Sequence, residues 1–209
     1  MDRAQHLVME DEHMDKLYAS SNPLVRWFFN LRLRTMARML PPKSLKILDV
    51  GCGEGHLIEC FSSMRGGDEF HGLDILDNTL AQAALRCPSA TFARGDACAM
   101  PFADATFDAV MCTDVIEHIH EYKLALAEMK RVLKPGGWLI INVPNDTTWT
   151  MVRFFLGRRP VRVPDHVNRF TAKSLQADVG WPKSAQKNLP FSLPFALALC
   201  TAVKFEKPN

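Results

Sequence analysis

Three glycines that alternate with other residues, Gly51, Gly53 and Gly55, mark a place where this chain could hold a ligand. They follow the mostly apolar residues 45–50, which are typical of a buried strand in a parallel sheet. Glycine lets the backbone turn sharply and approach a ligand closely, because it has no Cβ. A helix predicted over residues 56–64 would point its unpaired N–H groups at the turn. The pattern predicts a nucleotide-like ligand.

The spacing of the glycines discriminates between two nucleotide ligands. A dinucleotide-binding turn has the spacing G-x-G-x-x-G, whereas this chain has G-x-G-x-G and carries His56 in place of the third glycine of that motif. Asp49, near the end of the strand, would repel a pyrophosphate but would favour an amino group or a sulfonium. The cationic amino-acid end of S-adenosylmethionine therefore fits the turn better than NAD does.

The segment from Asp49 to Gly55, Asp-Val-Gly-Cys-Gly-Glu-Gly, resembles the first motif of class I S-adenosylmethionine-dependent methyltransferases. The resemblance is to the branch that includes the ubiquinone and menaquinone methyltransferases. It extends over about residues 14–207, because further motifs follow in the right order. It implies an α/β, Rossmann-like fold with a seven-stranded, mostly parallel sheet, an antiparallel last strand and helices on both faces.

Two later aspartates complete the predicted cofactor site. Asp74 ends the second predicted strand, where its carboxylate could accept hydrogen bonds from both ribose hydroxyls, whereas Asp77 is better placed to cap the next helix. The resemblance implies that Asp96 binds the adenine amino group and that the backbone N–H of Ala97 meets a ring nitrogen. The predicted cofactor ligands are Asp49, Gly51, Cys52, Gly53, Gly55, Asp74, Ile75, Asp96, Ala97 and Thr113.

The fourth predicted strand, residues 107–113, should end where ligands of open α/β sheets bind. Asp114, Glu117 and His118 follow it and resemble the arrangement that binds a divalent metal in the ubiquinone O-methyltransferases. The same Glu-His pair is common in relatives without a metal, and Asp114 is shorter than the glutamate of the metal pattern. A divalent metal is therefore left open, and no residue is assigned to it.

Three side chains are candidates for removing a proton from an oxygen or carbon acid: His118, Asp114 and His166, in that order. His166 lies in a segment that resembles the family motif H-x-x-x-F-t, where a histidine can face the acceptor. A histidine with an ordinary pKa exchanges protons near neutral pH. His166 could equally brace a lid through a hydrogen bond.

Two segments are predicted to cover the acceptor. Residues 1–42 form an N-terminal helical cap on the core of residues 43–209, and Arg26, Arg34 and Arg38 recur along one stripe of its helix. That stripe is either the solvated face of a helix packed on the sheet, or part of a cap that also touches an anionic or lipid surface. Residues 144–170 mix aromatic side chains with arginines and predict either a lid or an ordinary helix with snorkelling arginines.

Composition limits the remaining alternatives. The 209 residues suffice for one domain, and the six cysteines show no C-x-x-C pair, so neither a zinc site nor a disulfide framework is expected. A net charge of +2 and the absence of an Asn/Asp-Pro-Pro-Phe/Tyr motif disfavour a nucleic-acid substrate. No signal segment or membrane-spanning stretch is recognised, so a cytoplasmic monomer or homodimer is expected, with peripheral membrane contact left open.

Further elements are predicted along the chain. Helices are expected over residues 122–133 and 173–179, the second capped by Thr171, and strands over residues 69–75, 90–97, 138–143 and 198–205. The glycines of residues 134–137 should form a tight turn, and the apolar residues 189–199 should be buried or line a lid.

These patterns together predict a methyltransferase that uses S-adenosylmethionine and acts by in-line transfer on a small-molecule acceptor that is apolar or lipid-like. One alternative is a module of the same fold that binds S-adenosylmethionine or a partner without turnover. Another is an NAD-dependent oxidoreductase, which the glycine spacing disfavours.

Overall fold

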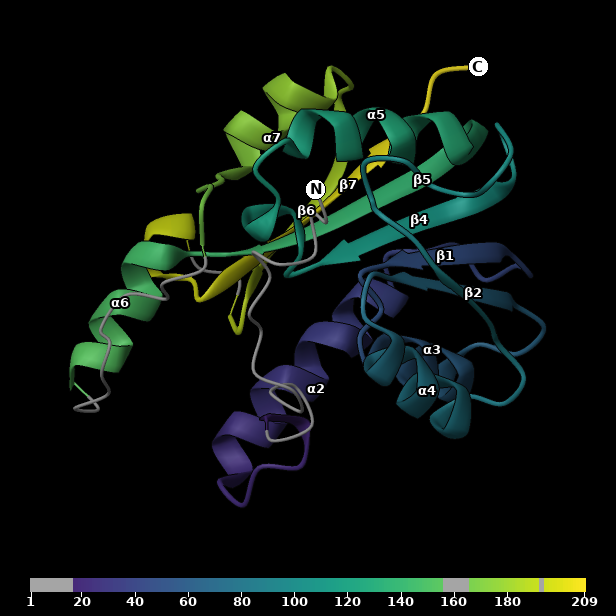
Figure 1. Cartoon of the computed structure of the whole chain (residues 1–209). Helices are drawn as coiled ribbons and strands as arrows, with labels where there is room; N and C mark the ends of the chain where they lie inside the picture. The colour runs from purple at the N-terminus through teal and green to yellow at the C-terminus, as the bar shows by residue number, and fades with distance from the viewer. Residues whose placement is uncertain (1–16, 156–165, 192–193) are drawn as a thin grey trace.

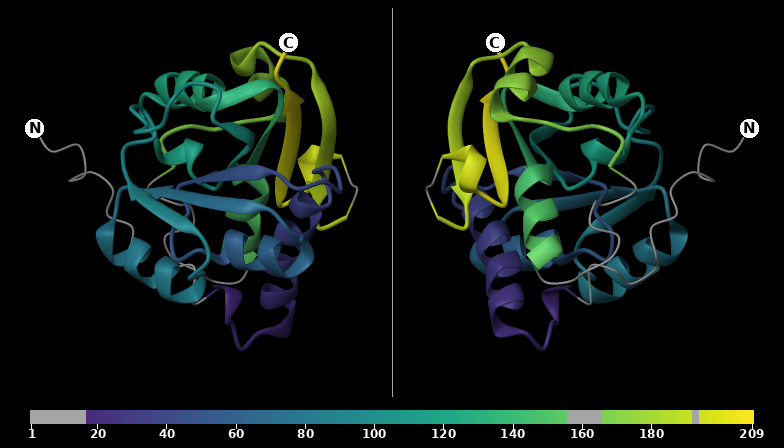
Figure 2. Two further views of the ribbon diagram at one scale, coloured as in Figure 1. Left: turned by 90° about the vertical axis from the view of Figure 1, so that its right-hand side faces the viewer. Right: turned by 90° about the vertical axis from the view of Figure 1, so that its left-hand side faces the viewer.

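The computed structural model describes residues 17–155, 166–191 and 194–209, which form a seven-stranded sheet between two layers of helices (Figures 1 and 2). The strand order is β3-β2-β1-β4-β5-β7-β6, and β7 runs antiparallel to both of its neighbours while the other strands are parallel. The predicted fold class is confirmed. The strands are β1 (Lys46–Val50), β2 (Glu69–Asp74), β3 (Thr91–Arg94), β4 (Phe107–Thr113), β5 (Leu133–Pro144), β6 (Lys183–Leu189) and β7 (Cys200–Glu206).

The helices cover the two faces of the sheet separately. In Figure 1, α5 and α7 lie above the sheet, whereas α2, α3 and α4 lie below it. The helices are α2 (Pro23–Ala37), α3 (His56–Met64), α4 (Asp77–Arg86), α5 (Tyr122–Val132), α6 (Asp146–Phe155) and α7 (Ala172–Val179), with short 3-10 turns η2 (Ile116–His118) and η3 (Phe195–Leu197).

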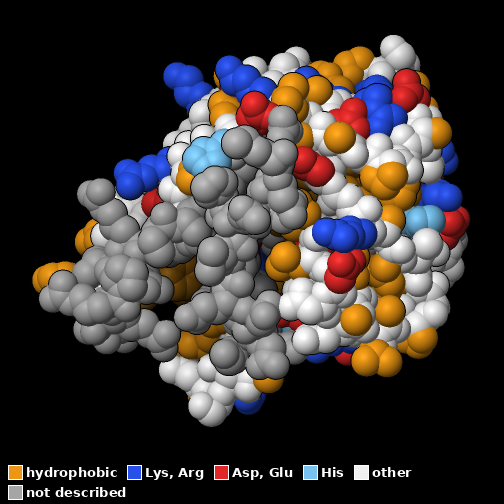
Figure 3. Space-filling view, in the orientation of Figure 1, with side chains coloured by type: hydrophobic (Ala, Val, Ile, Leu, Met, Phe, Trp, Pro, Cys, Tyr) orange, Lys and Arg blue, Asp and Glu red, His pale blue; other side chains and the backbone are white. Residues whose placement is uncertain are grey.

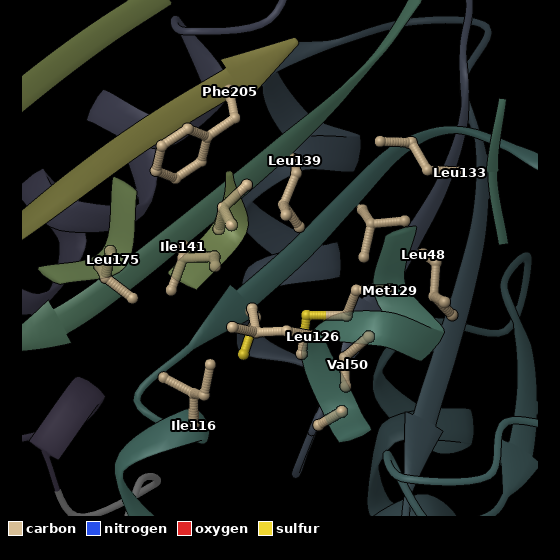
Figure 4. Close-up of a cluster of buried hydrophobic side chains, with 14 of the residues drawn as sticks. Leu48, Val50, Ile116, Leu126, Met129, Leu133, Leu139, Ile141, Leu175 and Phe205 are labelled. Carbon is tan, nitrogen blue, oxygen red and sulfur yellow. The ribbon is translucent and has the colours of Figure 1, made fainter. Parts of the chain in front are cut away.

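The sheet has a hydrophobic core on each of its two faces. Successive residues of the central strands contribute to opposite cores, because strand side chains alternate between the faces of a sheet. Leu48 and Ile141 belong to the cluster under α5 and α7, which Figure 4 shows. Their neighbours Ile47 and Ile140 belong to the cluster on the other face, with Phe61 of α3. A strand that is buried on both faces needs mainly apolar residues, as residues 45–50 provide apart from Lys46 and Asp49.

The order of the strands reverses between β1 and β4, since β2 and β3 lie on one side of this pair and β5 on the other. In open α/β sheets, ligands bind beyond the carboxyl ends of the strands at such a reversal. The segments that follow β1, β2, β3 and β4 therefore frame the expected site.

Helix α2 begins as predicted. Asn22 is its N-cap, with the side-chain Oδ1 accepting a hydrogen bond from the Leu24 N–H at 2.9 Å, and Pro23 is the first helical residue. Arg34 and Arg38 are exposed, whereas the inward face buries Phe29 and Met36. The division of the chain at residue 42 remains a prediction.

Three expectations about local structure need correction. Asp77 does not cap α4: the N-cap is Leu76, which makes no side-chain cap hydrogen bond, and Asp77 is the first helical residue. Residues 134–137 do not form a turn apart from the strand, because β5 begins at Leu133 and its pairing with β4 shifts register there. Residues 189–199 are only partly buried, since the side chains of Phe191 and Leu197 are 59% and 64% exposed.

Other expectations hold, or lie beyond what the structure describes. Thr171 caps α7 in a reciprocal capping box with Ser174, as its position suggested. Part of the predicted lid, residues 156–165 with Arg158, Arg159 and Arg162, lies outside the described residues. Among the described helices, none is long and apolar enough to cross a membrane.

Candidate functional site

A cavity opens at the carboxyl ends of β1, β2, β3 and β4, on the side of the sheet that α2 covers. Nine of the ten predicted cofactor ligands line it; Gly55 is not among the described lining residues and is instead the N-cap of α3. Of the predicted catalytic residues, Asp114 and His118 line the cavity. His166 is not one of the lining residues that the structure describes, but its ring contacts the ring of His118. The lining ligands are Asp49, Gly51, Cys52, Gly53, Asp74, Ile75, Asp96, Ala97 and Thr113.

The glycine turn at the end of β1 has a conformation that L side chains rarely adopt. Gly51 has a φ of +71°, and a Cβ there would stand 2.3 Å from Cγ2 of Val115. Gly53 has a φ of +50°, but a Cβ would meet no described atom within 4 Å, so the space beside it is open to a ligand. The N–H groups of Gly51 and Cys52 both donate to the Leu73 carbonyl, at 2.7 and 3.0 Å, which fixes the turn to β2.

Asp74 connects the turn to the end of β2. Its carboxylate accepts hydrogen bonds from the backbone N–H groups of Gly53 at 2.8 Å and of Leu76 at 3.0 Å, one on each oxygen. Each carboxylate oxygen can accept a further hydrogen bond, because it has two lone pairs. Asp96, after β3, is held in a similar way by the N–H of Cys98 at 2.8 Å. Both aspartates are thus oriented at the cavity by the backbone.

Asp49 is buried beneath the turn, and its side chain lines the cavity. Burial, and secondly the negative charge of Asp74, raise the pKa of the Asp49 carboxyl well above its usual value. A cationic group in the cavity would offset both effects, because it favours the ionised carboxylate. The electrostatics of this position therefore favour a positively charged ligand over an anionic one.

A buried arginine of α2 reaches the opposite wall of the cavity. The Arg32 guanidinium is 3% exposed, and it donates to the Asp114 carboxylate and to the Tyr18 hydroxyl, the latter at 2.9 Å. Asp114 also accepts a hydrogen bond from the Asn142 side-chain amide at 3.0 Å. The backbone of Asp114 is left-handed, with a φ of +54°. Such a conformation in a non-glycine residue is uncommon and is often found at functional sites.

Burial and neighbouring charges shift the pKa of Arg32 and of Tyr18. Burial alone would lower the pKa of Arg32, but Asp114, together with Tyr18 and Cys200, more than offsets this, and the pKa lies above its usual value. Burial raises the pKa of the Tyr18 hydroxyl, although Arg32 opposes the rise. Arg32 is therefore always charged, and Asp114 is its permanent partner. Arg32 was not among the predicted site residues, although an arginine among Phe28, Phe29, Leu33 and Met36 on the apolar face of α2 indicates a buried charge.

A second cluster of polar side chains lies in the segments that follow β4 and β5. Glu117 is 1% exposed, and within the described part of the chain neither of its carboxylate oxygens has a hydrogen-bond partner. Burial and the charge of Asp114 raise its pKa well above the usual value. The His118 and His166 rings meet edge to face, with centroids 4.9 Å apart, and Nδ1 of His166 lies 2.5 Å from the Asp146 carboxylate. Asp146 was not predicted; it begins α6 directly after β5.

Comparison with known proteins identifies the family. A family model described as a methyltransferase domain matches residues 48–141. A demethylmenaquinone methyltransferase of Renibacterium salmoninarum is 32% identical over 166 residues, which are 69% of this chain and 69% of that protein. This chain belongs to the S-adenosylmethionine-dependent methyltransferases. A demethylmenaquinone methyltransferase of Staphylococcus aureus is 36% identical over 113 residues, and the match spans about half of its length, 47%.

Solved structures agree with the methyltransferase fold. The N-methyltransferase NodS of Bradyrhizobium japonicum, in complex with S-adenosylhomocysteine, superposes with a TM-score of 0.68 at 17% identity, over 98% of this chain and 95% of NodS. The [4+2]-cyclase SpnF superposes with a TM-score of 0.66 at 17% identity, over 85% of this chain and 81% of SpnF. At such low identities the likeness shows the fold alone.

The metal pattern of the ubiquinone O-methyltransferases is only partly reproduced in this methyltransferase. Asp114, its first member, is paired with Arg32 instead of with the other two. Glu117 and His118 are joined by His166, and one ligand atom from each of these three lies within 4.8 Å of the others. A carboxylate and two imidazoles are ordinary ligands of divalent transition metals. The residues therefore fit a metal, through a set of donors that differs from the pattern of the ubiquinone O-methyltransferases.

The Arg32–Asp114 pair generates a stability prediction. Replacing Arg32 by Met should destabilise the protein by about 3–5 kcal/mol, because it leaves a largely buried carboxylate without its cation. Urea denaturation of the wild type and Arg32→Met measures the difference. Arg34→Met, an exposed arginine of the same helix, is the matched control and should change stability by less than about 0.5 kcal/mol. Equal losses in the two variants would contradict the assignment.

Proposed function

We propose that the chain binds S-adenosylmethionine in the cavity at the glycine turn and transfers its methyl group to a small apolar or lipid-like acceptor. The observation that carries this proposal is the convergence of four chain segments on one cavity. These are the turn after β1 and the segments that carry Asp74, Asp96 and Asp114, after β2, β3 and β4.

We assign the ligand contacts by charge and by available lone pairs. Asp49 faces the cationic amino-acid end, Asp74 accepts from the ribose hydroxyls, and Ile75, Asp96 and Ala97 hold the base. The bound cofactor would supply a methyl group on a sulfonium sulfur: the acceptor would bond to the methyl carbon in line with the carbon–sulfur bond, which would break and leave S-adenosylhomocysteine. The protein contributes mainly by holding the acceptor in that line, since alignment removes most of the entropic cost of the encounter.

Among the candidate proton acceptors, we place His118 first because it lines the cavity. His166 follows, since Asp146 fixes its ring orientation and its edge contacts the ring of His118. Asp114 comes last, because its carboxylate is already paired with Arg32 and bonded to Asn142, and so serves better to position the cavity wall. A base must reach the proton that it removes, and only then does its pKa matter.

An apolar acceptor is supported by the wall next to Asp114 and His118. Leu33, Val115 and Ile119 line that part of the cavity. Two relatives carry names with different acceptors, demethylmenaquinone and malonyl-[acyl-carrier protein]. We therefore propose the acceptor class from the apolar lining and do not assign the acceptor atom.

The cofactor assignment predicts the effect of one aspartate. Asp74→Ala should weaken the binding of S-adenosylmethionine and of S-adenosylhomocysteine at least about tenfold, because two hydrogen bonds from the ribose hydroxyls to a charged acceptor are lost. Isothermal titration calorimetry measures both affinities. Asp77→Ala, an exposed aspartate three residues later, is the control and should bind like the wild type. A folded wild-type protein that binds neither ligand would refute the proposal and favour a module without turnover.

As an alternative to His118 and His166 accepting a proton, we propose that Glu117, His118 and His166 hold a divalent cation, which would lower the pKa of an acceptor hydroxyl. The buried carboxylate of Glu117 supports this, because a cation would supply the partner that the described residues do not. Co²⁺ titration followed by visible absorption should show saturable binding, weakened at least about tenfold by Glu117→Gln and by His166→Gln. His120→Gln, an exposed neighbour, should bind Co²⁺ like the wild type. Co²⁺ binding that neither Glu117→Gln nor His166→Gln weakens would exclude this site.

A further inference from the structure

Helix α2 has two different faces. Phe28, Phe29, Arg32, Leu33 and Met36 point inward and are buried. On the opposite side, Trp27, Arg34 and Arg38 fall within about 40° of one another at about 100° per residue, and Leu24 lies next to them. These four side chains are exposed. The outer stripe of α2 therefore begins apolar, with Leu24 and Trp27, and continues basic.

The apolar part of this stripe continues onto neighbouring elements. The Trp27 ring lies 6.1 Å from the ring of Phe191, in the segment between β6 and η3, and Phe191 is 59% exposed. Behind it, Phe28 contacts Trp149 of α6, with centroids 6.0 Å apart. The right-hand view of Figure 2 shows α2, α6 and the segment before β7 on the same side of the molecule.

Large exposed apolar side chains are concentrated on these elements. Of the eleven that the described part of the chain exposes, seven belong to α2, α6 and the segment between β6 and β7. Figure 3 shows hydrophobic side chains projecting at the end of the molecule where Figure 1 places α6. Large apolar side chains that are exposed together in this way indicate an interaction surface. The seven are Leu24, Trp27, Met151, Phe154, Phe155, Phe191 and Leu197.

Apart from Asp146, which begins α6 and lies against His166, these elements and their flanking residues carry charge of one sign. Residues 17–43, 147–155 and 183–205 contain nine arginines and lysines and no aspartate or glutamate, so that all 23 acidic residues of the chain lie elsewhere. Arg32 is used inside the protein, but Arg26, Arg34 and Arg38 are exposed. On the right-hand side of Figure 3, by contrast, acidic and basic side chains are mixed.

We propose that the outer stripe of α2, together with Phe191, seats on a lipid bilayer that carries anionic headgroups. Exposed Trp, Phe and Leu side chains enter the boundary between headgroups and acyl chains, and nearby arginines pair with the headgroup charge. Tryptophan in particular is favoured at this depth of a bilayer. Because residues 17–43, 147–155 and 183–205 carry arginines and lysines and no carboxylate, their charge complements a surface of one sign, which anionic headgroups present.

The position of the stripe links this surface to the site. The inward face of α2 places Arg32 against Asp114 at the cavity wall, whereas the outward face carries Trp27. The two faces are separated by one helix, about 10 Å across. A bilayer seated on the outer stripe would therefore lie next to the cavity. The proposal that α2 binds a bilayer does not depend on the proposed function, although the enzyme could find an apolar acceptor in such a bilayer.

Co-sedimentation with vesicles tests the proposal. The full chain should bind vesicles that contain about one third phosphatidylglycerol in phosphatidylcholine, and binding should weaken as the salt concentration rises. Arg34→Gln with Arg38→Gln should lower the partition coefficient at least about tenfold on these vesicles. Trp27→Ser with Phe191→Ser should lower it by a similar factor, because the apolar anchors are lost.

Matched controls separate this surface from unspecific effects. Leu85→Ser removes a leucine of α4 that is 85% exposed, and it should leave vesicle binding unchanged. All variants should retain the wild-type affinity for S-adenosylmethionine, which shows that they are folded and separates this test from the test of function. Equal binding to pure phosphatidylcholine, or binding that the Arg and Trp variants do not affect, would overturn the proposal. Self-association without vesicles that the Trp27 variant abolishes would assign the stripe to a second copy of the chain.

Discussion

The ion pair between Arg32 and Asp114 is the constraint on which the arrangement of the site depends. A guanidinium that is removed from water must find an anion, because an unpaired buried charge costs several kcal/mol. Asp114 meets this requirement directly after β4, where its backbone is in a left-handed conformation. The pair therefore fixes the position of α2 relative to the carboxyl edge of the sheet, and it also sets the direction in which the chain leaves β4 towards His118. Through the amide of Asn142 the same carboxylate is tied to β5.

The polar groups of this wall are only partly satisfied by one another. In the described part of the chain, Nε of Arg32, Oδ1 of Asn142 and both carboxylate oxygens of Glu117 have no hydrogen-bond partner. A buried polar atom without a partner is costly, and native proteins accept that cost mainly at sites that bind something. The wall that we propose to bind the cofactor is different, since the Asp74 carboxylate is held by two backbone N–H groups. One wall is thus preorganised by the backbone, whereas the other keeps unused polar atoms near the proposed position of the acceptor.

The features that the sequence predicted well are local or depend on the ends of consecutive strands. The glycine turn, Asp74 and Asp96 could be placed because a parallel sheet brings the carboxyl ends of its strands to one edge. The partners Arg32, Asn142 and Asp146 could not be placed, because each acts on a residue more than 19 positions away, across α2, β5 or α6. Local rules also failed where tertiary packing competes with them. Asp77 is a residue type that often caps helices, but here it is the first residue of α4. Phe191 and Leu197 are apolar yet exposed, although Leu189 and Ala198 of the same segment are buried.

An apolar residue type alone does not predict that a side chain is buried. Phe28 and Trp27 are adjacent aromatic residues of one helix, yet only Phe28 is buried, because a step of about 100° carries Trp27 out of the contact with Trp149. A ligand that binds the outer face of α2 only when the helix is in its folded position stabilises that position by mass action. The inward face of the same helix carries Arg32, so the stabilisation extends to the Arg32–Asp114 pair and to the cavity wall that it supports. In this way α2 couples a surface contact to the geometry of the site without any contact between the surface ligand and the substrate.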